Sequence, residues 1–171
     1  WEGAIRLTPD ELSPYTGWDI IAIVFYHYET PPFLNNVVKV YDNGSPYAPG
    51  PVITSEPYTS DIAGWKWVDL SNPVTITGAD DLWCSIEMTS EAGEYPLGVS
   101  AGPPVDGKSD WIAFYPGSWA ELQDWGLYYN WQILAIVQLL LDNDVAIVSI
   151  DMPDILQPDT TFNPQATAKN L

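Results

Sequence analysis

The sequence DLWCSIEM, residues 81–88, alternates between two kinds of side chain with a period of two residues. Cys84 and Ile86 share one phase, whereas Trp83 and Glu87 share the other. Because successive side chains of a strand point to opposite faces, this pattern predicts a strand with one face in an apolar core. The single cysteine lies in the core phase and has no second cysteine to pair with, so we expect a buried and unreactive thiol.

Similar short segments lie on both sides of this strand, separated by clusters of Pro, Gly, Asn and Asp. The segments that predict further strands are 1–7, 19–28, 36–42, 51–58, 64–76, 95–100, 110–115 and 129–141. Short strands at this spacing indicate an all-β jelly-roll sandwich of two antiparallel sheets. One helical turn is expected near the N-terminus, because Thr8 and Glu11 form a capping-box pattern around Pro9. Pro14 then ends this turn.

The pattern changes near residues 142–144, where a complete run of strands gives way to a new alternating strand and a Pro-rich segment. We expect a jelly-roll accessory domain over residues 1–141, then a linker and the first strands of a truncated immunoglobulin-like module over residues 142–171. The tail is too short to bury a core of its own. An unpaired strand at 145–150 would favour edge pairing, so a strand-swapped dimer through the tail is one predicted association.

The chain has 23 acidic and 5 basic side chains, which gives a net charge of -18. Such a field repels nucleic acids and anionic membranes, so neither is expected as a partner. The longest apolar run, ILAIVQLLL, is too short to span a bilayer. The charge suits a solvated surface that resists aggregation, the binding of cations, or a basic or neutral ligand.

Catalysis is the less favoured interpretation. The only histidine, His27, lies within a predicted strand, and no nucleophile-elbow motif accompanies it. Glycoside hydrolysis by paired carboxylates remains an alternative, because acidic residues are abundant. The candidate pairs are Glu87 with Glu91 or Glu94, and Asp106 with Asp110.

A structural calcium ion is a further prediction, since calcium prefers six to eight oxygen ligands from loops rich in carboxylates and carbonyls. The loops YDNGS and VDGKSD contain the candidate ligands Asp42, Asp106 and Asp110. Neither loop matches the EF-hand pattern, and the alternative is that each Asp-Gly or Asn-Gly only forms a turn.

Aromatic residues are unusually frequent, with nine tryptophans and ten tyrosines. The strand phases place Trp67 and Trp83 outward, where aromatic faces could stack on sugar rings and nearby acids could accept hydroxyl hydrogen bonds. The predicted ligand-binding residues are Trp67, Asp69, Trp83, Glu87, Trp111 and Trp119. The alternative is that these rings pack under loops or against a neighbouring domain, in which case the chain is a structural spacer.

Several segments, among them GWKWVDLSNPVTITGADDLWCSIEM, YPLGVSAGPPVDGKSDWIAF and YNWQILAIV, follow the order seen in one class of accessory domain. Over residues 1–138 the chain resembles the adhesin-like jelly-roll modules of secreted bacterial proteins, of the gingipain-adhesin type. Residues 143–170 resemble the opening strands of an immunoglobulin-like, cell-adhesion-related bacterial module.

The resemblance implies a non-catalytic module of a larger secreted or cell-surface protein. Its role would be adhesion, substrate targeting or spacing, with a polysaccharide or cell-surface ligand and the neighbouring domains as partners. It also implies structural calcium, but no motif assigns the calcium ligands.

Overall fold

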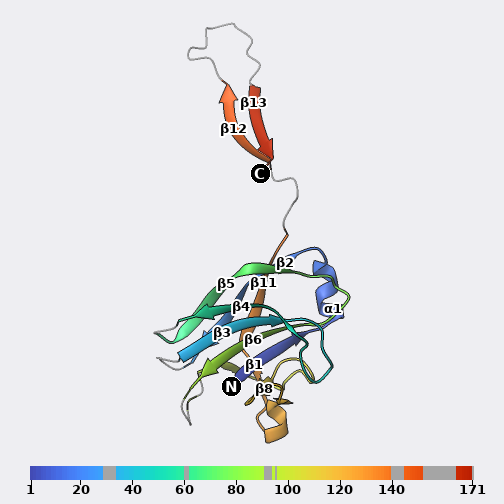
Figure 1. The fold of residues 1–171 in the computed structure, drawn as a ribbon, viewed down its shortest axis with the longest axis vertical. Helices are drawn as coiled ribbons and strands as arrows, with labels where there is room; N and C mark the ends of the chain where they lie inside the picture. Colours follow the sequence, from blue (N-terminus) through green and yellow to red (C-terminus); the bar gives the residue numbers. More distant parts are fainter. Residues whose placement is uncertain are drawn as a thin grey trace. The chain divides into compact units, whose positions relative to one another are not determined.

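The computed structural model describes residues 1–28, 34–59, 62–90, 94, 96–139, 145–151 and 165–170 (Figure 1). The chain divides into two compact units, Trp1–Leu139 and Leu140–Leu171. The first unit contains every element up to β11, and the second contains β12 and β13.

The strands of the first unit are β1 (Glu2–Leu7), β2 (Asp19–His27), β3 (Leu34–Tyr41), β4 (Val52–Tyr58), β5 (Gly64–Thr75), β6 (Leu82–Thr89), β7 (Val99–Ala101), β8 (Trp111–Ala113), β9 (Trp119–Glu121), β10 (Tyr129–Trp131) and β11 (Ile133–Gln138). The helical segments are α1 (Pro9–Leu12), η1 (Ser13–Tyr15) and η2 (Leu122–Trp125).

Two antiparallel sheets enclose the core of the first unit. The larger sheet has six strands in the order β4-β3-β6-β1-β8-β9, and the smaller has three in the order β11-β2-β5. Strands β10 and β7 pair with each other in a separate two-stranded sheet. The core cluster joins Ile86 and Val38 of the larger sheet to Phe25 and Ile23 of the smaller one, all fully buried. The expected all-β sandwich of antiparallel sheets is thereby confirmed.

Strand β6, the predicted core strand, has a central position in the larger sheet and pairs with both β1 and β3. Its inward side chains Cys84, Ile86 and Met88 are completely buried, as the alternation predicts. Burial raises the pKa of the Cys84 thiol to about 12, so the thiol stays protonated and unreactive at neutral pH. The other face of β6 points away from this core and carries the residues considered below.

The helical turn near the N-terminus is also confirmed. Helix α1 begins with Pro9 directly after Thr8, and the Thr8 backbone N–H donates to Glu11 Oε2 at 2.9 Å. This is the reciprocal bond of a capping box, which satisfies donors that the first helical turn leaves free. In the part of the chain that is described, no helix has the length and hydrophobicity needed to cross a membrane.

In the second unit, β12 (Val145–Asp151) pairs in antiparallel fashion with β13 (Gln165–Asn170). The strand expected at 145–150 therefore has a partner within its own chain. The linker residues 142–144 lie outside the described residues. The strand-swapped dimer and the immunoglobulin-like identity of this unit stay predictions.

Candidate ligand-binding site

The outer face of the larger sheet collects side chains from strands that are far apart in the sequence. In β3, Val38 and Val40 point into the core, so the intervening Lys39 lies on the outer face. Register places Lys39 opposite Ser85 of β6, and Glu87 of β6 opposite Glu2 of β1. The sheet thus brings one basic and two acidic side chains into one neighbourhood.

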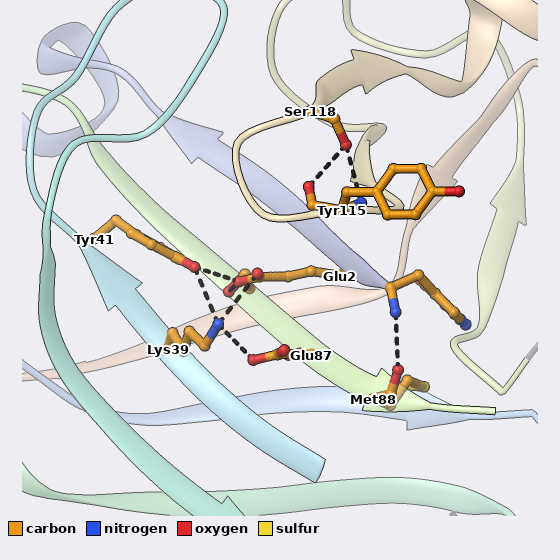
Figure 2. Close-up of polar contacts among 9 residues, drawn as sticks. Glu2, Lys39, Tyr41, Glu87, Met88, Tyr115 and Ser118 are labelled. Atoms are coloured by element: carbon orange, nitrogen blue, oxygen red, sulfur yellow. Dashed lines mark hydrogen bonds and ion pairs between the residues drawn. The ribbon is translucent and has the colours of Figure 1, made fainter. Parts of the chain in front are cut away.

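These groups form a connected hydrogen-bond network, shown in Figure 2. Lys39 Nζ lies 2.6 Å from Glu87 Oε2 and 3.2 Å from Glu2 Oε2. The Tyr41 hydroxyl donates to Glu2 Oε1 at 2.7 Å, and the Ser85 hydroxyl donates to the same oxygen. Both oxygens of the Glu2 carboxylate are therefore occupied, whereas Glu87 keeps a side chain that is 45% exposed. Glu87 is therefore the most exposed of the paired groups, against 17% for the Lys39 side chain.

Burial and neighbouring charges shift the pKa of the Lys39 ammonium in opposite directions. Burial by itself would lower the pKa of the Lys39 ammonium, but the carboxylates of Glu87 and Glu2 outweigh it and raise this pKa above its usual value. Burial, together with the Glu2 carboxylate, raises the pKa of Tyr41. At neutral pH the network therefore presents a protonated amine, a protonated phenol and the partly exposed Glu87 side chain.

The network lies at one side of a pocket of about 290 Å³, named here the Lys39 pocket. Its lining residues are Trp1, Glu2, Lys39, Tyr41, Pro49, Gly50, Glu87, Ala113, Phe114, Tyr115, Pro116, Gly117 and Trp119. The turn from Tyr115 to Ser118 forms part of the rim, and two hydrogen bonds between these residues close it (Figure 2). Gly117 has a φ of 79° in this turn, a conformation that favours glycine.

The predicted residues Trp83, Glu87, Trp111 and Trp119 share this outer face, but they do not have equal access to solvent. Trp83 is fully buried and Trp111 is 3% exposed, so neither ring presents a face to solvent in this fold, and ligand binding by them stays a prediction. The ring of Trp83 lies 5.2 Å from that of Trp111 and 6.0 Å from that of Trp119, centroid to centroid. Strands β8 and β9 extend the sheet beyond β1 and supply the rings that cover Trp83. Trp119 remains half-buried and lines the Lys39 pocket.

Trp67 and Asp69 lie elsewhere, on the solvent face of the smaller sheet. Trp67 is 56% exposed, and its indole N–H donates to Asp69 at 2.6 Å. Trp67 belongs to β5 and Trp83 to β6, which are strands of different sheets, so the two cannot form one platform. Trp65, which was not predicted, shares the face of Trp67 and its exposure; the two-residue spacing in GWKW is the signal that could have found it.

The predicted calcium ligands do not form a common site. No group of three or more His, Cys, Asp or Glu side chains within the described residues is arranged to hold a metal ion. Asp42 is exposed and accepts the backbone N–H of Asn43. Asp106 accepts the amide of Gln123 at 2.9 Å, and Asp110 accepts the backbone N–H of Gln123 at 3.2 Å. Calcium at these residues stays a prediction.

Among the acidic residues whose burial the structure describes, Asp110 is the one that is completely buried. Its Oδ1 has no hydrogen-bond partner among the described residues. Burial, followed by the negative charges of Glu121, Asp106 and Asp124, raises the pKa of Asp110 to about 6.

Lys39, Glu2 and Tyr41 were missed at the sequence level. The available signal was the charge of Lys39 between two valines, in a chain with only five basic residues. Its partners could not be recognised in advance, because Glu2 is 37 residues away in the sequence.

Comparison of the chain with protein-family models, with curated proteins and with solved structures found no match.

Proposed function

We propose that the chain is a non-catalytic binding module that holds a carbohydrate in the Lys39 pocket. The observation that carries the proposal is the exposed Glu87 carboxylate, paired with Lys39 beside the aromatic rings of Trp119 and Tyr115. Sugar rings have apolar C–H faces that pack on aromatic rings, and hydroxyl groups that both donate and accept hydrogen bonds. The pocket offers both kinds of contact within one small space.

The size and charge of the site narrow the ligand class. A volume of about 290 Å³ lies at the lower end of the range of small-molecule sites and suits about one or two sugar rings. The net charge of -18 disfavours uronic acids and sulfated sugars. We therefore infer a neutral or amino sugar, at a chain end or in a short glycan.

The contacts of the carboxylates support binding rather than hydrolysis. A glycosidase needs two carboxyl groups that flank the substrate, one of them free to donate a proton. Glu2 is saturated by Lys39, Tyr41 and Ser85. Asp110 has the raised pKa of a general acid but is fully buried, out of reach of a substrate. Glu94 lies outside the lining of the Lys39 pocket, and Glu91 lies outside the described residues.

The wider role follows from this proposal. A module that binds glycans would direct a larger secreted or cell-surface protein to its substrate or to a cell. A structural spacer is the second candidate, and the burial of Trp83 and Trp111 favours it because these rings serve packing.

We expect the chain to bind at least one neutral glycan in a glycan screen, followed by titration calorimetry. The variants Glu87→Gln and Tyr115→Ala should each weaken binding about ten-fold or more, because each removes a contact reachable from the pocket. Glu87→Gln keeps the shape of the side chain, and Tyr115 is 76% exposed, so both variants should fold normally.

The matched control is Trp65→Ala, which removes an exposed aromatic ring from the smaller sheet. Affinity should be unchanged in this variant. If Trp65→Ala loses binding and the pocket variants keep it, the glycan site lies on the smaller sheet instead. If the chain binds no glycan, the proposed binding function is wrong and the structural spacer is the better account.

A further inference from the structure

We propose that the ligand is an amphiphilic glycoside, whose sugar lies in the Lys39 pocket and whose apolar group lies in a second pocket beside it. This inference rests on the proposed carbohydrate function and names the class of ligand more closely. It follows from the size, lining and position of the larger pocket of the first unit.

The second pocket, named here the apolar pocket, has a volume of about 910 Å³. Aromatic and aliphatic side chains dominate its lining, among them Val99, Ile112, Trp125, Leu127, Tyr129 and Trp131. Several of them are unusually exposed for apolar residues: Trp125 by 52%, Leu127 by 45% and Val99 by 39%. A concave apolar surface of this size is typical of sites that bury most of a drug-sized ligand.

Two tryptophans in this pocket present carbon rather than N–H to a ligand. The indole N–H of Trp1 donates to Ser90 Oγ at 2.8 Å, and that of Trp131 donates to the backbone oxygen of Trp111 at 2.8 Å. The two rings are stacked with centroids 5.9 Å apart. Since both N–H groups are already bonded, these two rings offer no hydrogen-bond donor to a ligand and contact it through carbon atoms alone, as an alkyl chain requires.

The two pockets are neighbours, because Trp1 and Phe114 line both. Phe114 is 55% exposed and packs edge-on against Trp125, with centroids 5.8 Å apart. A ligand that passes over Phe114 would therefore contact the charged network on one side and the apolar walls on the other.

The charge of the lining decides between kinds of amphiphile. Among the described residues that line the apolar pocket, Glu94 is the only one with a charged side chain, and none is a Lys or Arg. The strongly acidic net charge of the chain also disfavours an anionic lipid. A neutral head with hydroxyl groups, joined to an apolar chain, matches both pockets.

The test compares methyl and octyl β-glycosides of glucose, galactose, mannose and N-acetylglucosamine by titration calorimetry, below the concentrations at which the octyl compounds form micelles. Burial of methylene groups should raise affinity at least about two-fold per methylene, and so about a hundred-fold or more between methyl and octyl glycosides of the preferred sugar. An octyl oligo(ethylene glycol) ether, which has the chain but no sugar, should bind far more weakly than the octyl glycoside.

Leu127→Gln should remove most of the gain in affinity that the octyl chain provides, and it should leave the affinity for the methyl glycoside unchanged. Leu134→Gln is the matched control, because Leu134 is a similarly exposed leucine of the smaller sheet, 51% exposed. Glu87→Gln should weaken methyl and octyl glycosides by the same factor.

The outcomes separate this inference from the proposed function. A methyl glycoside that binds as tightly as its octyl counterpart would overturn the amphiphile proposal and leave the carbohydrate site standing. Equal binding of the octyl glycoside and the octyl ether would show that the sugar contributes nothing, which overturns both. No binding of any probe would likewise overturn both.

Discussion

Replacement of Trp83 by alanine should lower the free energy of unfolding by about 3–5 kcal/mol, the largest effect expected for a single change on the outer face of the larger sheet. The ring is fully buried and contacts Trp111 and Trp119 at centroid distances of 5.2 and 6.0 Å. Its removal leaves a cavity that the neighbouring rings cannot fill without giving up their own contacts. Urea denaturation followed by far-ultraviolet circular dichroism measures the loss.

Trp83→Phe is the control that separates packing from hydrogen bonding. The Trp83 indole N–H is buried and makes no hydrogen bond to any described residue. A phenyl ring restores much of the buried area and removes an unpaired donor that itself costs about 1–3 kcal/mol. We expect Trp83→Phe to cost less than half as much as Trp83→Ala. Equal losses in the two variants would contradict a tightly packed ring cluster.

Replacement of Asp110 by asparagine should raise the free energy of unfolding at pH 7 by about 1–3 kcal/mol. The pKa of Asp110 rises from the ordinary value of 3.8 to about 6 in the folded protein, because the carboxyl group is buried near Glu121, Asp106 and Asp124. Ionisation at pH 7 therefore costs more in the folded than in the unfolded chain. An amide avoids this cost because it carries no charge.

The sign of the pH dependence follows from the same shift. Between pH 3.8 and about 6 the folded state retains a proton that the unfolded state has released. The contribution of Asp110 to stability is thus most favourable below pH 3.8 and declines as the pH rises through this window. The difference between Asp110→Asn and the natural chain should shrink toward zero near pH 3.5. Denaturation curves at several pH values measure it.

Asp69→Asn is the matched control, because it changes the net charge equally at an exposed carboxylate. This variant should alter stability by no more than about 0.5 kcal/mol. A loss of stability in Asp110→Asn at pH 7, together with stabilisation of the natural chain by calcium and destabilisation by a chelator, would contradict an uncompensated buried charge. That combination would support the predicted calcium site instead.

Most of the strands and the helical turn could be predicted because their signals are local, whereas the three-residue strand β9 was missed. Alternation in residues 81–88 follows from the two-residue period of a strand, and it correctly assigned Cys84 and Ile86 to the core. The capping box at Thr8 needs only residues within one helical turn. The all-β class and the two-sided character of the larger sheet were therefore visible in the sequence.

The candidate site was only partly predictable. The prediction that Trp83 and Glu87 lie on the outer face of β6 is correct. The alternation of side chains along the strand does not show, however, whether other residues cover them. Trp83 is sealed by rings from β8 and β9, whereas Glu87 stays accessible beside Lys39. Trp67 and Trp83 do not form a common platform for a related reason. The alternation of side chains along a strand does not show to which sheet the strand belongs.

The sequence by itself determined where most of the strands lie, which side chains of β6 face the main core and that the chain is strongly acidic, although it did not predict β9. These properties depend on the two-residue period of a strand and on composition. Both can be recognised from neighbouring residues, without knowledge of the rest of the chain. Only the tertiary structure decided that Glu2 and Lys39 meet and that Trp83 is buried. It also decided that two pockets share Trp1 and Phe114. Such contacts depend on strand order and register across distant segments, which hydrophobic burial selects for the whole chain at once.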